Sequence, residues 1–234
     1  MAAACRSPGS WLEVGGGLAL ARDAGCVHFH HETPLRTLSS ALVGLGLGWS
    51  RDICNFYVDK DYAGQAPRAD LQGWLTARGL EAEDCVAMMT AVPLAHLALE
   101  EAHAGERRVL VAVTAGVGNA VDITAPVRDD PRLVAGTINI QVFIDGHLDD
   151  GALVNAVQSA SEAKVRALDA LGIRDPLSDT PATGTSTDCL VIAATQRGGV
   201  TPYAGSGTLL GRAIGGGVFR AIQASLAMAG EAAP

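Results

Sequence analysis

Residues 181–195, PATGTSTDCLVIAAT, join a loop of small hydroxyl side chains to an apolar run that is typical of a buried strand. The loop ends in a carboxylate, Asp188, directly before the apolar residues. An ordinary turn uses the same residue types, because Ser, Thr and Asp bond readily to nearby backbone groups. The rest of the chain therefore decides whether this loop does more than reverse the chain.

Two further apolar runs carry a similar polar loop. Residues 107–121, RRVLVAVTAGVGNAV, predict a strand at 109–113 and a glycine loop that ends in Asn119. Residues 133–146, LVAGTINIQVFIDG, place Thr137 and Asn139 in alternation with isoleucines. If the three strands lie side by side, their polar groups converge on one rim or cleft. We expect a single α/β domain over residues 1–234, a mixed β-sheet with flanking helices.

Residues 150–172 predict a long amphipathic helix between the second and third of these strands, with Gly172 as its stop. At 100° per residue Lys164 falls within the apolar stripe, and Glu162 falls on the polar face. A lysine on an apolar face extends to water, meets an internal acceptor or lines a cleft. Asp188 of the hydroxyl loop is a natural candidate for the acceptor.

The last segment predicts a helix in which an apolar residue recurs every four positions, interrupted by the consecutive glycines 215–217. Glycine in a helix costs about 1 kcal/mol relative to alanine, so close packing against a neighbour is expected there. The preceding loop, YAGSGT at 203–208, is either a plain helix cap or a site where backbone N–H groups meet a polar ligand.

The first 35 residues predict short strands and turns. His28 and His30 alternate and share one face of such a strand, while His31 points the other way. A metal site is possible, but no carboxylate or cysteine stands at a spacing that requires one, so a structural or solvent-facing role is favoured. No residue is assigned as a metal ligand.

The segment from 36 to 103 gives a mixed pattern. Arg36, Ser39 and Ser40 precede a glycine-spaced apolar stretch, and Asn55 is expected near the start of a strand at 56–58. Residues 69–79 predict a helix. A strand is expected next, and then a helix opened by Pro93, whose surface would carry His96 and His103 on one face.

Composition excludes several classes of protein. The net charge of −8 argues against nucleic-acid binding, which needs a basic face. The five cysteines are scattered without a CxxC pair, which favours a reducing compartment. No apolar segment precedes Cys5 as a secretory or lipoprotein signal would require, and no apolar run approaches the ~20 residues of a spanning helix. We expect a cytoplasmic protein without membrane association.

Six motifs in order carry a resemblance to a known family. They are RTLSSA (36–41), TAGVGNA (114–120), GTINI (136–140), ALVNAVQSASEAKVRAL (152–168), ATGTSTD (182–188) and YAGSGT (203–208). Together they resemble the adenosylcobinamide amidohydrolase (CbiZ) family, from about Arg36 to Phe219. The chain departs from the family pattern at Ser186, where the family has glycine.

The resemblance implies an enzyme of corrinoid salvage. Members of the family cleave the amide that joins the aminopropanol arm to the corrin ring, which releases adenosylcobyric acid. Some members are thought to act on complete cobamides, which permits remodelling. The corrinoid is then the substrate, no cofactor is expected, and a divalent metal is not excluded by the sequence. The oligomeric state is left open.

The catalytic candidates are Asp188, Lys164, Thr185 and Glu162. Asp188 can act as a base towards water or orient Lys164, which can donate a proton or stabilise charge. Thr183 and Thr185 can donate to an oxyanion or supply a nucleophile, and Glu162 is the alternative base. The candidates for substrate binding are Arg36, Ser39, Ser40, Asn55, Asn119, Thr137, Asn139, Thr183 and Gly184.

Three other functions remain open from the sequence. One is a corrinoid-binding protein without chemistry. Another is a phosphate-handling enzyme, although the chain lacks GxxxxGK[ST] and a basic cluster. The third is a self-processing hydrolase with an N-terminal threonine nucleophile.

Overall fold

A computed structural model describes residues 10–126 and 137–230. Cys5 and residues 133–136 of the second apolar stretch therefore lie outside the described residues. The helices are α1 Pro67–Ala77, α2 Asp150–Ala170 and α3 Leu209–Ala229, with 3₁₀ turns at Ala82–Asp84 and Leu94–His96. The strands are β1 Leu12–Glu13, β2 Leu18–Arg22, β3 Cys26–Ser39, β4 Gly46–Tyr57, β5 Cys85–Thr90, β6 Ala98–Ala104, β7 Arg107–Ala115, β8 Ala120–Val121, β9 Ile138–Ile144, β10 His147–Leu148, β11 Gly184–Thr185, β12 Cys189–Ala194 and β13 Val200–Thr201.

A mixed sheet of nine strands organises the domain. Its main path runs β1-β2-β3-β12-β9-β7-β6, while β4 pairs with β3 and β5 pairs with β4. The long strand β3 belongs to both halves of this sheet. Its first half pairs with β2 and its second half with β12, and the register to β4 shifts between His30 and Leu35. The sheet therefore curls at β3 into two halves that face each other.

The three strands singled out in the sequence are adjacent, in the order β12-β9-β7. Strand β9 is parallel to β12 and antiparallel to β7. The start of β9 therefore lies beside the start of β12 and the end of β7. The expectation that their polar loops converge on one rim is confirmed.

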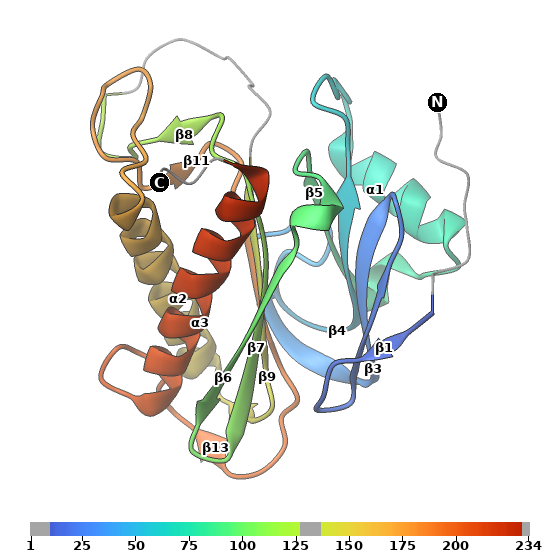
Figure 1. The fold of residues 1–234 in the computed structure, drawn as a ribbon. Coiled ribbons are helices and arrows are strands. Elements are labelled where there is room, and N and C mark those ends of the chain that lie inside the picture. The colour runs from blue at the N-terminus through green and yellow to red at the C-terminus, as the bar shows by residue number, and fades with distance from the viewer. Residues whose placement is uncertain (1–9, 127–136, 231–234) are drawn as a thin grey trace.

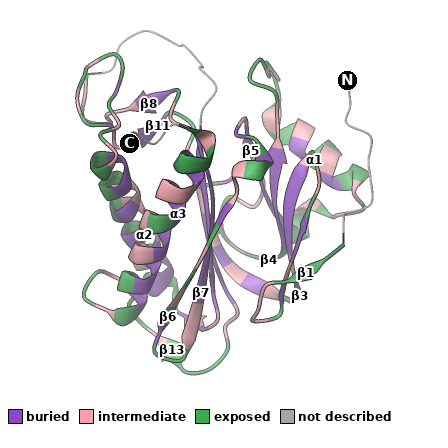
Figure 2. Cartoon of the chain, viewed as in Figure 1, coloured by how far each residue is buried: buried purple, intermediate pink, exposed green. Residues whose placement is uncertain are grey.

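Three apolar layers result from this curl (Figure 1). One lies between α2, α3 and the helix-facing side of β7, β9 and β12. A second fills the space between the two halves of the sheet, and a third lies between α1 and the outer side of β4 and β5. Figure 2 shows the central strands mostly buried, with the exposed residues of α2 on its outward side. The fold class predicted from sequence is confirmed.

Among the consecutive glycines of α3, Gly217 packs as closely as the sequence predicts and Gly215 does not. A Cβ placed on Gly217 would lie 2.8 Å from Cγ2 of Val111 on β7, whereas one on Gly215 would find its nearest neighbours at 3.9 Å. The start of α3 is a plain cap, since the Thr208 side chain accepts a hydrogen bond from the N–H of Gly211. The cap is therefore confirmed, and a polar ligand at this loop stays a prediction.

Alanine at these two glycines is expected to have opposite effects. Gly217→Ala overpacks against Val111, which costs about 1–3 kcal/mol and outweighs the helix propensity gained. Gly215→Ala gains that propensity, up to about 1 kcal/mol, without a clash. Urea denaturation of the two variants measures both changes, and equal stabilisation by both would contradict the close contact at Gly217.

Two sequence predictions are wrong in this half of the chain. Pro93 opens only the short 3₁₀ turn, after which residues 98–104 form β6, so His96 and His103 share no helix. Exposed and more buried residues alternate along β6 with the period of two that is typical of a strand. This pattern of burial decides the structure there, although several of the residues favour a helix. Asn55 lies near the end of β4, because that strand begins nine residues earlier, at Gly46.

Candidate active site

Lys164 of α2 and Asp188 form an ion pair beside the rim where the three strands meet. The Nζ of Lys164 donates to Oδ2 of Asp188, and the two side chains retain 18% and 17% exposure. Lys164 therefore neither extends fully into water nor lies buried. An ammonium has three N–H donors, and in the part of the chain that the structure describes Lys164 uses one, so the others remain available to a bound molecule.

Asp188 is saturated as an acceptor. Its Oδ1 accepts from the N–H of Ile138 at 3.1 Å and from the Thr185 hydroxyl. Its Oδ2 accepts from Lys164 and from the N–H of Thr185 at 3.1 Å. A carboxylate offers about four acceptor positions, so little capacity remains for an attacking water. Of the two roles open from the sequence, the geometry favours orientation of Lys164.

Gly184 is required by this pair. A Cβ at position 184 would lie 2.5 Å from Oδ2 of Asp188 and 2.7 Å from Nζ of Lys164. The backbone of β11 therefore runs directly against the ion pair. This position accommodates the pair because glycine has no side chain, and Gly184 itself is buried.

A cleft of about 330 Å³ opens beside the ion pair, between α2 and strands β3, β9 and β12. Its polar side chains are Ser39, Ser40, Ser161, Lys164 and Asp188. Its other lining residues are Leu38, Ile138, Ile140, Val157, Cys189 and Leu190. The sequence analysis identified four of the five polar residues and missed Ser161.

The three serines of the cleft differ in their local bonding. The Ser39 hydroxyl accepts from the N–H of Ala41, and the Ser40 hydroxyl accepts from the N–H of Leu190 at 3.0 Å. Within residues 10–126 and 137–230, no hydrogen bond involves the Ser161 hydroxyl. Ser161 precedes Lys164 by three residues on α2, a spacing that places both on one helix face. The signal that could have found it is therefore S-x-x-K, at 161–164.

Cys189 lines the same cleft but is a poor nucleophile. Burial raises the pKa of its thiol to about 12, although the Ser40 hydroxyl acts in the opposite direction. The reactive form of cysteine is the thiolate, so Cys189 is protonated and unreactive near neutral pH.

Asn119 lies at the same rim, behind the hydroxyl loop. Its Nδ2 donates to the Ser186 hydroxyl at 2.8 Å, and its buried Oδ1 has no hydrogen-bond partner among the described residues. The two residues that follow Asn119 form β8, which pairs with β11 so that Ala120 lies opposite Thr185. Ser186 of the hydroxyl loop therefore holds the amide of Asn119.

Other substrate-binding candidates form a buried network. Nδ2 of Asn139 donates to Oδ1 of Asn55 at 2.8 Å, and Nδ2 of Asn55 donates to the Thr114 hydroxyl at 3.0 Å. The Thr137 hydroxyl donates to the backbone carbonyl of Thr187 at 2.8 Å. These side chains are buried, so the structure places Asn55, Thr137 and Asn139 as supports of the loops.

The remaining candidates lie outside the cleft. Thr183 accepts from the N–H of Ile123, which fastens the hydroxyl loop to the segment after β7. Glu162 is exposed on the polar face of α2, as the helix period predicts. Arg36 bonds to Asp150 at 2.8 Å, and its guanidinium lies 5.5 Å from the Trp49 ring centroid.

An exposed apolar surface continues the cleft across β3 to β4. Leu38 lines the cleft, and its partner across the strand pair is Leu47, while Arg36 is opposite Trp49. Residues in register point to the same face of a sheet. Leu47 and Trp49 are 48% and 51% exposed, so we call them, with Leu38, the apolar platform.

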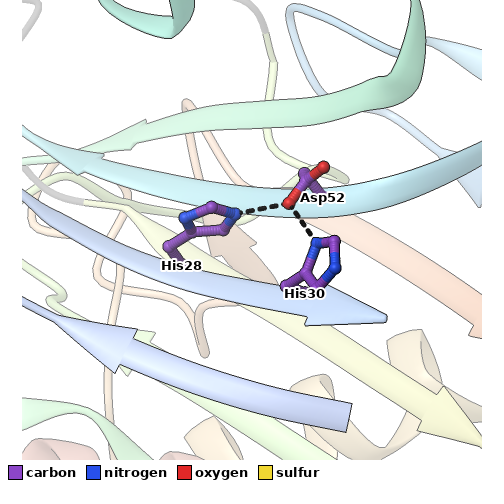
Figure 3. Close-up of side chains that lie close together, drawn as sticks. All are labelled: His28, His30 and Asp52. Carbon is purple, nitrogen blue, oxygen red and sulfur yellow. Dashed lines mark hydrogen bonds and ion pairs between the residues drawn. The ribbon is translucent and has the colours of Figure 1, made fainter. Parts of the chain in front are cut away.

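A second polar cluster lies on the other half of the sheet (Figure 3). Nε2 of His28 lies 2.6 Å from Oδ1 of Asp52, and Nδ1 of His30 lies 2.8 Å from the same oxygen. Burial alone would raise the pKa of Asp52, but the hydrogen bonds from both imidazoles outweigh it and lower the pKa. The carboxylate comes from β4, 22 residues after His30, which is why the spacing within β3 did not reveal it.

Comparison with known proteins gives consistent matches. The family model described as adenosylcobinamide amidohydrolase matches residues 13–234. An adenosylcobinamide amidohydrolase of Halobacterium salinarum is 32% identical over 80% of this chain and 72% of its own length. One of Methanosarcina mazei is 28% identical over 76% of this chain and 84% of its own. An uncharacterised protein of Methanocaldococcus jannaschii is 29% identical over 70% and 68%.

A solved structure, that of the PH0078 protein from Pyrococcus horikoshii OT3, covers 89% of this chain and 78% of its own, with a TM-score of 0.47 and 12% identity. No helix among the described residues has the length and apolar character needed to cross a membrane.

Proposed function

Because the chain belongs to the adenosylcobinamide amidohydrolase family, we propose that it hydrolyses the amide between the corrin ring and the aminopropanol arm of adenosylcobinamide, giving adenosylcobyric acid. The observation that carries the proposal is the Lys164–Asp188 pair. Its ammonium lines the cleft, and among the described residues it has N–H donors that the pair does not use. Such a donor can polarise an amide carbonyl. We place the reaction in the cytoplasm, where the product returns to cobalamin synthesis, and include remodelling of complete cobamides.

The cleft suits one arm of the substrate rather than the whole ring. Its volume of about 330 Å³ is at the lower end for sites that hold a drug-sized ligand. We propose that the aminopropanol arm and its amide enter the cleft. The corrin ring, which is broad and partly apolar, then rests on the apolar platform that is continuous with the cleft at Leu38.

Lys164 is proposed to stabilise the transition state. Attack on an amide carbon places negative charge on the carbonyl oxygen, and a fixed cationic donor stabilises this charge more than it stabilises the ground state. Asp188 accepts one hydrogen bond from the ammonium and is itself held by three others, from the N–H of Ile138 and from the N–H and hydroxyl of Thr185, so no reorientation is needed during the reaction.

Ser161 is the proposed nucleophile. It borders the cleft, and it lies one helical turn before Lys164. Its Oγ bonds to the amide carbon and the C–N bond breaks as the Lys164 ammonium gives a proton to the departing nitrogen. The Lys164 amine that results accepts the hydroxyl proton of Ser161. Water then cleaves the ester, which restores the Ser161 hydroxyl and releases the carboxylate. Lys164 is thus an ammonium both before and after the first step.

The proposal is tested by incubating the purified protein with adenosylcobinamide. We expect adenosylcobyric acid and aminopropanol, detected by chromatography and mass spectrometry, with and without a chelator. The rival is a corrinoid-binding protein without chemistry. An intact corrinoid that stays bound without any product would support that rival and exclude hydrolysis of this substrate.

A further inference from the structure

We propose that His28, His30 and Asp52 form a binding site for a divalent transition metal ion of the zinc class. Their three donor atoms, two imidazole nitrogens and one carboxylate oxygen, all lie within 4.8 Å of one another. Figure 3 shows both rings directed at the same carboxylate oxygen from the neighbouring strand. The proposal does not depend on the amidohydrolase activity.

The donor set determines which ions fit. Two imidazoles with one carboxylate suit zinc, cobalt(II), nickel and iron(II), whereas magnesium and calcium prefer oxygen ligands. Bonds of about 2.0–2.1 Å in a tetrahedral zinc site hold neighbouring donors about 3.3 Å apart. The nitrogens now lie 2.6 and 2.8 Å from Oδ1 of Asp52. For an ion to enter, each of these nitrogen–oxygen distances must therefore lengthen by less than about 1 Å. Side-chain rotation supplies such a movement without a change in the strands.

The surroundings support a site that an ion can enter. The side chains of His28 and Asp52 are 7% and 9% exposed, while that of His30 is 38% exposed and gives access. The ring of Trp11 lies 5.0 Å from His28 and 5.8 Å from His30 between ring centroids. Trp11 thus covers the cluster and provides an optical reporter beside it.

The site lies away from the cleft. His28 and His30 alternate along β3 with Val27 and Phe29, which face the apolar layer between the two halves of the sheet. The histidines therefore face outward from one half, whereas the cleft opens on the helix-covered side of the other half. An ion here would tie β3 to β4 and contact no molecule in the cleft. Its expected effect is on stability.

The experiment is a titration of chelator-treated protein with Zn²⁺ and Co²⁺ by calorimetry, with Mg²⁺ as the hard-ion comparison. We expect one Zn²⁺ per chain, visible absorption from bound Co²⁺, and Co²⁺ quenching of tryptophan fluorescence that Trp11→Phe removes. Bound Zn²⁺ should raise Tm in a saturable way, because it binds the folded state. Zero stoichiometry, or equal affinity for Mg²⁺ and Zn²⁺, would overturn the proposal.

His30→Ala is the decisive variant, because the side chain of His30 is 38% exposed and its removal leaves the His28–Asp52 contact in place. It is expected to weaken Zn²⁺ binding at least about tenfold. Substitution of a residue that only orients a metal ligand already lowers metal affinity by about that factor. The matched control is His103→Ala, which removes an exposed histidine that also bonds to a carboxylate, Glu101, at 3.1 Å. If His30→Ala keeps the wild-type Zn²⁺ affinity, or if only His103→Ala loses Zn²⁺ affinity, the ion does not bind at His28, His30 and Asp52 and the proposal is wrong.

Discussion

Lys164→Met is expected to lower kcat/KM for adenosylcobinamide by about 100- to 10,000-fold, mainly through kcat. The methionine fills a similar volume but has no N–H to meet the developing oxyanion or the departing nitrogen. Each of these functions is commonly worth two to four powers of ten in rate. Steady-state kinetics with product measured by mass spectrometry gives both constants.

The variant should remain folded, which makes the loss of rate interpretable. Without Lys164, the Asp188 carboxylate keeps three donors, from the N–H of Ile138 and from the N–H and hydroxyl of Thr185. The cost in unfolding free energy is then about 2 kcal/mol, the value of one charged hydrogen bond.

Two controls separate the role of Lys164 from general effects. Arg166→Met removes an exposed cation two residues further along α2 and should leave both kinetic constants unchanged. Trp49→Ala removes the largest side chain of the apolar platform and should raise KM while kcat is kept. If Lys164→Met retains full kcat, the ion pair is only structural and the proposed mechanism fails.

Lys164 and Asp188 were predictable because helix geometry acts over short distances. The 100° period alone places Lys164 within the apolar stripe of α2, where an ammonium needs an acceptor. The adjacency of β7, β9 and β12 was a hypothesis raised by three similar strand and loop patterns, which one sequence cannot prove. Asp188 was named as the partner of Lys164 because it is the carboxylate of the hydroxyl loop. The structure confirms both the adjacency and the pair.

Asp52 was not predictable as a neighbour of His28 and His30, because their meeting depends on the register of β3 against β4. Register is determined by the curl of the sheet and its irregularity after His30, which no local pattern in β3 encodes. Asn55 and Asn139 were predicted to bind the substrate, but one sequence does not show which side of a strand faces a cleft. The alternation of faces placed them in the interior, where they bond to each other.

Ser161→Ala is expected to reduce kcat by at least about 1,000-fold if its hydroxyl forms the acyl intermediate. Loss of a nucleophile removes the covalent route, and only slow attack by water remains, as in serine hydrolases stripped of their serine. Binding of the corrinoid, measured by its absorbance change, should be nearly unaffected, because the substitution removes a single oxygen from the wall of the cleft. The same assay that measures Lys164→Met measures this variant.

The covalent intermediate gives a second and independent observation. Rapid quenching of the wild-type reaction should yield protein with the added mass of the corrinoid acyl group on the peptide that contains Ser161, and Ser161→Ala should show none. Ser40→Ala is the matched control, since Ser40 borders the same cleft but its hydroxyl accepts from the N–H of Leu190. If Ser161→Ala keeps the wild-type kcat and no adduct forms, water attacks directly. Lys164 would then act on the carbonyl and the leaving nitrogen alone. Ser161 would only line the cleft, and its S-x-x-K spacing to Lys164 would have no role in the reaction.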